Sequence, residues 1–231
     1  MATMFWNPML RWQQRGLLGH ILISALPLVF LVLPYSANAQ KDLATKTVVA
    51  LHTEQRNAYD ALQYVAFRAN IVIGVSAILS PNDERFKLDF PGGTVSDLMN
   101  TFHSQASGLR WQQNGNIIHV SSSDAGSPLA NVVLNYPGAR EKNRLQIWTQ
   151  VRTSPEVKNW LRANRCREIG RFSPYAFLQP KNRPDAISIS PGSMTLAQLL
   201  DKVATQTGVN FWAVLQTAPT AKSCHVSIMP W

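Results

Sequence analysis

Histidine is the residue type of this sequence that is closest to catalytic chemistry, because its side chain exchanges protons near neutral pH. Four histidines follow residue 39, at His52, His103, His119 and His225. His103 follows Phe102 on the flank of a predicted helix, where a solvated or partly packed ring is the common outcome. His119 and His225 take equivalent places in two predicted strands, which favours a shared structural role. No G-x-S-x-G, H-E-x-x-H, phosphate-loop or paired-carboxylate motif is present, so we predict no enzyme, no catalytic residue and no cofactor.

A run of basic residues is the stronger candidate for binding chemistry. Its members are Lys158, Arg162, Arg165, Arg167, Arg171, Lys181 and Arg183, and Glu168 is the acidic residue within that span. Aromatic residues are interleaved with them, which is typical of surfaces that bind nucleic acid or another anionic polymer. The plainer interpretation is a solvated helix face followed by a loop, because surface charge runs are usually just that. Both interpretations stay open at this point.

The two cysteines, Cys166 and Cys224, are the candidates for a disulfide. An oxidising compartment would allow them to form one structural bond. They cannot define a metal site, because no histidine or acidic residue lies near them at ligand spacing.

The first 39 residues have the order of a secretory signal peptide. Arg11 and Arg15 precede an apolar run over residues 17–33, and Ser36-Ala37-Asn38-Ala39 offers an A-x-A cleavage site. We therefore predict cleavage after Ala39 and a periplasmic or secreted product. The alternative is an inner-membrane anchor through residues 17–33, although this run is interrupted by a proline and is shorter than the ~20 residues of a spanning helix.

The residues after this segment carry 20 basic and 13 acidic side chains. A moderate positive charge suits anionic surfaces, but it is equally common among ordinary exported proteins. The charge alone therefore selects no class of partner.

Hydrophobic periodicity predicts the elements that would position these residues. In the first half we expect strands over 47–51, 71–75, 86–90, 109–113 and 117–120, with helices over 58–69 and 95–106. Asn57 is a predicted N-cap, Asn70 and Gly108 are predicted helix stops, and Asn114-Gly115 predicts a hairpin. The serine- and glycine-rich residues 121–128 predict a linker.

The second half is predicted to be less regular. We expect strands over 132–134, 145–151, 187–189, 211–215 and 225–229, with helices over 155–164 and 196–207. Residues 171–185 contain three prolines and predict an irregular loop.

Phe86–Val120 and Ile187–Val214 are two copies of one pattern. Pro191-Gly192 corresponds to Pro91-Gly92, and Gly208 corresponds to Gly108, each one hundred positions later. The apolar faces of the two helices align at a spacing of 101 positions instead of one hundred. This difference implies a shift of one residue near each helix end. The first helix of the second copy matches poorly, so we expect that half to be truncated or altered.

The order β-α-β-β-α-β-β resembles the short N-terminal domain shared by secretins and TonB-dependent outer-membrane receptors. The residues that carry this resemblance are Ala61-Leu62, Val65-Ala66 and the run TLAQLLDKVATQTGV over 195–209. It implies an α+β fold of two small helix-on-sheet units, the second less regular. The expected boundaries are a signal peptide over 1–39, a first unit over 40–122, a linker over 123–130 and a second unit over 131–231.

The same resemblance implies a function in protein–protein interaction. We expect a non-catalytic module or adaptor of the cell envelope, with an envelope protein as partner and no small-molecule substrate. Binding of an anionic envelope polymer or nucleic acid through residues 158–183 is the alternative, and a small exported enzyme is the third hypothesis.

Overall fold

The structure is a computed structural model that describes residues 42–79, 85–122, 126–170, 186–217 and 224–229. The predicted signal peptide therefore lies outside the described residues. Helices and strands are mixed along the chain in an α+β fold, which confirms the predicted class. Within the described ranges, no helix has the length and apolar character needed to cross a membrane.

In the first half, the described residues form seven strands and two α-helices after a short 3-10 helix, η1 (Leu43–Thr45). They are β1 (Thr47–Val48), β2 (Leu51–Gln55), α1 (Ala58–Arg68), β3 (Val72–Leu79), β4 (Phe86–Phe90), β5 (Gly93–Thr94), α2 (Val95–Gln105), β6 (Leu109–Asn114) and β7 (Ile117–Ser122).

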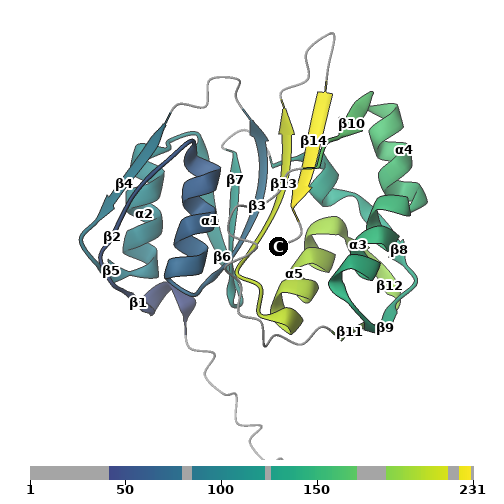
Figure 1. Ribbon diagram of the computed structural model, residues 1–231, viewed down its shortest axis with the longest axis horizontal. Coiled ribbons are helices and arrows are strands. Elements are labelled where there is room, and N and C mark those ends of the chain that lie inside the picture. The colour runs from purple at the N-terminus through teal and green to yellow at the C-terminus, as the bar shows by residue number, and fades with distance from the viewer. Residues whose placement is uncertain (1–41, 80–84, 123–125, 171–185, 218–223, 230–231) are drawn as a thin grey trace, which may run out of the picture. The chain divides into compact units, whose positions relative to one another are not determined.

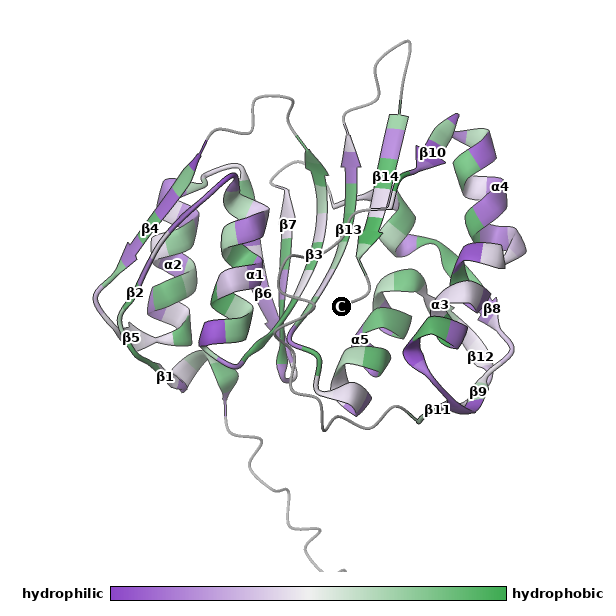
Figure 2. Ribbon diagram, in the orientation of Figure 1, coloured by the Kyte–Doolittle hydropathy of each residue, from purple (hydrophilic) through white to green (hydrophobic). Residues whose placement is uncertain are grey.

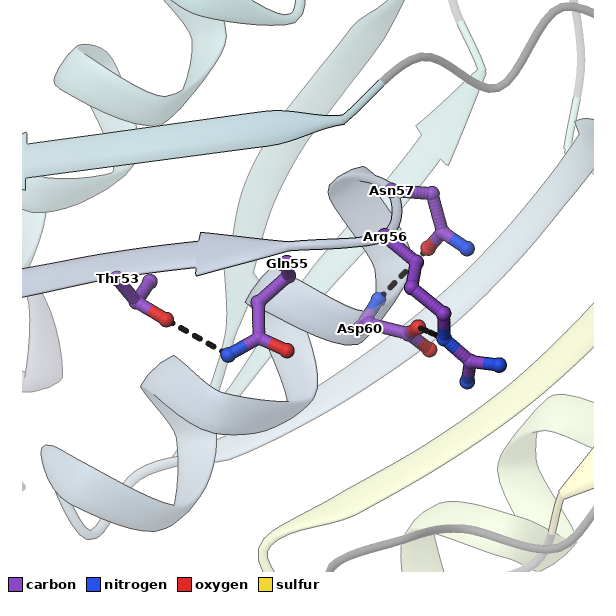
Figure 3. A network of polar contacts seen from close by, with 5 residues as sticks. All are labelled: Thr53, Gln55, Arg56, Asn57 and Asp60. Carbon is purple, nitrogen blue, oxygen red and sulfur yellow. Dashed lines mark hydrogen bonds and ion pairs between the residues drawn. The ribbon is translucent and has the colours of Figure 1, made fainter.

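Local polar contacts fix the start of α1, as Figure 3 shows. The Asn57 side chain accepts a hydrogen bond from the Asp60 amide at 2.9 Å, so the predicted N-cap is confirmed. Arg56 Nε lies 2.9 Å from Asp60 Oδ2, and this carboxylate stands in the first turn, where the helix dipole favours negative charge. Just past the other end, Asn70 has φ +48°, as predicted for a residue that stops a helix.

The second half begins with a 3-10 helix, η2 (Pro128–Asn131), and its described ranges form seven strands and three α-helices. They are β8 (Val133–Tyr136), β9 (Ala139–Lys142), α3 (Arg144–Thr153), α4 (Pro155–Ala163), β10 (Cys166–Glu168), β11 (Ile187–Ile189), β12 (Gly192–Thr195), α5 (Leu196–Thr207), β13 (Phe211–Thr217) and β14 (Cys224–Met229).

The predicted strand over 145–151 is wrong, because these residues form the helix α3. Asn143 and Gln146 make a capping box, in which each side chain accepts a hydrogen bond from the other residue's amide. Ile147 and Val151 are the buried residues of α3, and their spacing of four places both on one helix face.

A six-stranded sheet runs through both halves in the order β10-β14-β13-β3-β7-β6 (Figure 1). β3 lies parallel to β7 on one side and to β13 on the other, and β10 lies parallel to β14. β6 with β7 and β13 with β14 are antiparallel hairpins. The seven-residue pairing from Ile73↔Phe211 to Leu79↔Thr217 joins the two halves.

Strand pairing shows that the duplication extends to every strand of the two halves, which we call the first copy (42–122) and the second copy (128–229). The pairs β1–β5, β2–β4, β3–β7 and β6–β7 recur as β8–β12, β9–β11, β10–β14 and β13–β14, with the same relative directions. The second copy is therefore altered rather than truncated. Its alteration is the pair α3 and α4, which stands where the first copy has α1.

The helices α2 and α5 correspond at a spacing of 101 positions, and so do the contacts that begin them. Thr94 and Thr195 are the N-caps, each with a capping box. Val95 donates its amide hydrogen to Lys46 and Leu196 donates to Val132, both at 2.9 Å. The N-terminus of α2 and that of α5 are thus each bound by the residue before the first strand of their own copy.

The predicted helix stop is confirmed at Gly208 and wrong at Gly108. Gly208 is the C-cap of α5 with φ +65°. Gly108 does not have positive φ, and α2 ends at Gln105 with Ala106 as its C-cap at φ −124°. The apparent slip in the sequence arises because these two glycines are not structural equivalents.

The copies place their helices on opposite faces of the shared sheet. In β13, Phe211, Ala213 and Leu215 pack in the core that contains α1 and α2. Trp212 and Val214 pack in the other core, with α3, α4 and α5. In Figure 2 the green, hydrophobic segments of β3 and β13 lie between α1 and α5. Since β6 also runs opposite to β13, the copies are related by a half-turn about an axis across the strands combined with a shift of three strands along that axis.

Candidate functional site

The predicted disulfide between Cys166 and Cys224 is confirmed. The two residues are direct neighbours in the parallel pairing of β10 with β14, with their Cα atoms 4.4 Å apart. The bond ties an edge strand to the sheet. A disulfide of this kind is typical of compartments outside the reducing cytoplasm.

The basic run is only partly described. Lys158 and Arg162 lie on α4, Arg165 follows that helix and Arg167 lies on β10, and all four side chains are exposed. The remaining three predicted members, Arg171, Lys181 and Arg183, lie outside the described residues.

The four described basic side chains are not compensated by an acidic side chain of the described residues. Glu168 lies 2.9 Å from Arg152 Nε, so its charge is already paired. Arg162 donates to the amide oxygen of Asn159 at 3.3 Å, which compensates no charge. No ion pair involves Lys158, Arg162, Arg165 or Arg167 among the residues that the structure describes.

The four histidines do not converge on one site. His52 lies on β2, 3.6 Å from the Asp89 carboxylate, and both side chains are exposed. The His103 ring contacts the carbonyl oxygen of Leu109. His119 Nε2 lies 3.2 Å from Asp201 Oδ2, and its ring meets Trp212 edge-on. In the described part of the chain, no three His, Cys, Asp or Glu side chains are grouped to hold a metal ion.

Two equivalent tryptophans mark a site that the sequence analysis missed. Trp111 on β6 donates its indole hydrogen to Asn100 Oδ1 on α2 at 3.2 Å. Trp212 on β13 donates to Asp201 Oδ1 on α5 at 2.9 Å. Both members of the second pair lie 101 positions after those of the first, so the copies share the tryptophan, its acceptor and the bond between them.

Trp212 is covered by the strand that joins the two copies. Its side chain is fully buried, and Gly74 of β3 is its direct neighbour across the sheet. A Cβ atom at Gly74 would lie 2.3 Å from Cζ2 of the indole, so the ring occupies the space that a side chain would take. Ile73 donates its amide hydrogen to the Asn210 carbonyl at 2.8 Å and begins the ladder beside Trp212.

Trp111 stands at the corresponding place on a strand with an open side. β6 pairs with β7 and with no other strand in the described ranges, and the Trp111 side chain is half-buried. We call the side of β6 that faces away from β7 the β6 edge. The β6 edge corresponds to the side of β13 that pairs with β3.

The hairpin geometry shows which main-chain groups lie on the β6 edge. Gly115, with φ +61°, and Asn116 form a two-residue loop, so Asn114 and Ile117 are a hydrogen-bonded pair. Such pairs alternate along an antiparallel ladder, so the main-chain groups of Leu109, Trp111 and Gln113 point away from β7.

Part of this edge is already occupied by local contacts. Leu109 donates to the Ala106 carbonyl, and its own carbonyl contacts the His103 ring. The Gln113 side chain accepts a hydrogen bond from the Ala44 amide at 2.9 Å. Among the described residues, no other segment donates to or accepts from the main chain of Trp111 or Gln113, so these groups can receive another strand.

No protein-family model, curated protein or solved structure matches this chain.

Proposed function

We propose that this protein is a non-catalytic interaction module of the cell envelope that binds a partner protein by adding a partner strand to the β6 edge. The observation that supports this function is the pairing of β3 with β13. It places a parallel strand on the side of β13 that β6 leaves open in the other copy. Open strand edges are used in this way for recognition, because the main-chain ladder supplies affinity and alternate side chains supply specificity.

The envelope location is part of the proposal. The disulfide between β10 and β14 supports a compartment that oxidises thiols. The basic, apolar and A-x-A order of residues 1–39 supports export by a cleaved signal peptide into a periplasm. The resemblance to the short N-terminal domain of secretins and TonB-dependent receptors supports an envelope protein as partner.

Site-specific photocrosslinking in intact cells tests this function. A photoreactive residue replaces Gln112, whose side chain is exposed on β6, and in a parallel strain it replaces Lys87, which is exposed on β4. We expect one defined adduct from position 112 that position 87 does not give. Equal adducts from both positions would contradict binding at β6.

A matched pair of variants links the adduct to the main chain of the β6 edge. Gln113→Pro removes an amide hydrogen that points away from β7, while Gln113→Ala keeps it and loses the same side-chain contacts. We expect proline to abolish the adduct at position 112 and alanine to retain it. An adduct that survives the proline substitution would refute strand addition.

Binding of an anionic polymer is the second candidate function. It is supported by the four exposed basic side chains of Lys158 and Arg162 on α4, Arg165 between the two elements and Arg167 on β10. Their neighbouring acid, Glu168, is paired with Arg152. Retention on heparin should then fall with rising salt, because each neutralised phosphate or sulfate releases counterions. The triple variant Arg162→Ala, Arg165→Ala, Arg167→Ala should elute at lower salt; unchanged elution would refute this function.

A further inference from the structure

We propose that the strand bound at the β6 edge runs parallel to β6 and carries glycine, or a residue nearly as small, opposite Trp111. On the other face of the sheet it carries an acidic residue opposite Arg110. This inference rests on the proposed function and specifies the partner that the β6 edge selects.

The internal pairing shows what a strand needs in order to lie beside this tryptophan. β3 contributes Gly74 directly opposite Trp212, and any Cβ there would overlap the indole. The indole cannot turn aside without losing its hydrogen bond to Asp201. A neighbouring strand with a larger residue at that position would have to displace a fully buried ring.

Trp111 has the same restraint, and no strand of the described residues covers it. Its bond to Asn100 holds the indole against α2, as the bond to Asp201 holds Trp212 against α5. The half-buried ring therefore leaves a place for a strand whose residue opposite Trp111 has almost no side chain. The partner would cover Trp111 as β3 covers Trp212.

The direction of the added strand follows from the same correspondence. β3 is parallel to β13, and the Ile73–Asn210 bond starts a parallel ladder on that side. Because β6 corresponds to β13, a strand that repeats this geometry is parallel to β6.

The opposite face of β6 sets the second requirement. Arg110 and Gln112 are exposed there, whereas the matching face of the internal junction is apolar and lies under α1 and α2. A bound strand thus needs polar residues on this face. The guanidinium of Arg110 favours a carboxylate directly opposite, since cross-strand pairs of opposite charge stabilise a sheet.

A second copy of this chain does not supply such a strand through its described residues. β10 is the counterpart of β3 at the other end of the sheet, and it has three residues and no glycine. Cys166 is held in the disulfide and Glu168 is paired with Arg152. The remaining member, Arg167, is exposed and has the same charge as Arg110. The occupant that fits is a strand of another protein.

Two short peptides test this inference on the purified protein. The first is Thr-Val-Glu-Gly-Thr-Val-Thr, which in parallel register places glycine opposite Trp111 and glutamate opposite Arg110. The second has leucine in place of glycine. We expect the glycine peptide to bind about tenfold more tightly, or more, because the leucine side chain overpacks against the indole.

Protein variants locate the preference on the named side chains. Trp111→Ala should remove the difference between the two peptides, and Arg110→Glu should weaken binding of both by several-fold. Thermal melting checks that the variants fold. A nitroxide at the peptide N-terminus should broaden the amide signal of Leu109 more than that of Asn114, and the reverse order would overturn the parallel direction.

Other outcomes overturn the inference while they leave the proposed function to its own test. Equal binding of the two peptides to the wild-type protein, or no binding of either, would refute the requirement for a small residue. A dimer that the glycine peptide does not compete would show that the occupant is a second copy. In each case the Gln112 adduct and its loss in Gln113→Pro would still decide whether the β6 edge binds a partner.

Discussion

The junction of the two copies is most sensitive at Gly74. In Gly74→Ala the new methyl group would lie 2.3 Å from Cζ2, 2.4 Å from Cε2 and 2.8 Å from Nε1 of Trp212. Carbon atoms in contact are normally about 3.5–4.0 Å apart, so either the ring or the β3–β13 pairing must shift by more than 1 Å. Because Trp212 is fully buried and hydrogen-bonded to Asp201, either shift would destabilise the folded state.

The expected cost follows from two opposing effects. Overpacking a dense core costs about 1–3 kcal/mol and more where the clash is severe. Alanine recovers about 0.4–1 kcal/mol relative to glycine by restricting the unfolded chain. The clash at Gly74 is severe, so we take the upper end of the overpacking range, about 3 kcal/mol, and subtract the gain from alanine. The expected net loss in the free energy of unfolding is about 2 kcal/mol.

Urea denaturation followed by tryptophan fluorescence measures this loss, with Gly108→Ala as the matched control. Apart from Gly108 itself and its two chain neighbours, no described heavy atom lies within 4 Å of a Cβ built at Gly108, and its φ is not positive. The control should therefore be neutral or slightly stabilising. In Trp212→Leu the smaller side chain should tolerate alanine at residue 74. Gly74→Ala should therefore cost less stability in this background than in the wild type, and a double-mutant cycle measures the difference. Equal stability of Gly74→Ala and Gly108→Ala would refute the described junction.

Three further predictions concern the parts of the fold that hold the sheet together. Replacing Cys166 and Cys224 with serine opens a link between residues 58 apart and should cost about 4 kcal/mol on the chain-entropy estimate, measured by urea denaturation; a loss below 1 kcal/mol would contradict it. Leu98→Asp and Leu199→Asp each place a carboxylate in a core where the native side chain has 0% exposure, and each should lower the melting temperature sharply through a cost of several kcal/mol; unchanged melting would show that the helix faces are misplaced. Hydrogen bonds from the Thr94 amide and hydroxyl lower the pKa of Asp97 below its ordinary value of 3.8, so its contribution to stability is complete above that pH and is lost as pH falls through the lowered pKa. Asp97→Asn should therefore lose less stability than the wild type on acidification below pH 3.8, and identical acid profiles would contradict this role.

The sequence predicted the elements of the first copy well because their signals are local. Asn57 caps α1 as predicted, and the Asn114-Gly115 signal lies at a hairpin whose two-residue loop is Gly115-Asn116. The strand wrongly predicted over 145–151 shows the limit of short patterns. Leu145, Ile147 and Val151 fit both an alternating strand and a helix face, and the capping residues Asn143 and Gln146 carried the deciding information.

The shared sheet could not be predicted, because parallel pairing between distant strands has no local signal in the sequence. The residues of β3 and β13 predict two buried strands, and they would do so equally if the strands belonged to separate sheets. The correspondence of Trp111 with Trp212 could have been predicted from the sequence, because the two residues are 101 positions apart. The apolar faces of the two corresponding helices have the same spacing. The glycines at a spacing of one hundred concealed it, although Gly108 and Gly208 play different roles.

Residue-resolved amide hydrogen exchange of the isolated protein tests the central claim, that β6 offers the edge which β13 has filled. Trp111 and Trp212 are compared directly, because both amides point away from the hairpin partner of their own strand. The amide of Trp212, in the ladder with β3, should exchange among the slowest in the protein, and that of Trp111 should exchange orders of magnitude faster than its neighbour Gln112. An equally protected Trp111 amide would show that the β6 edge is already occupied and would contradict the account.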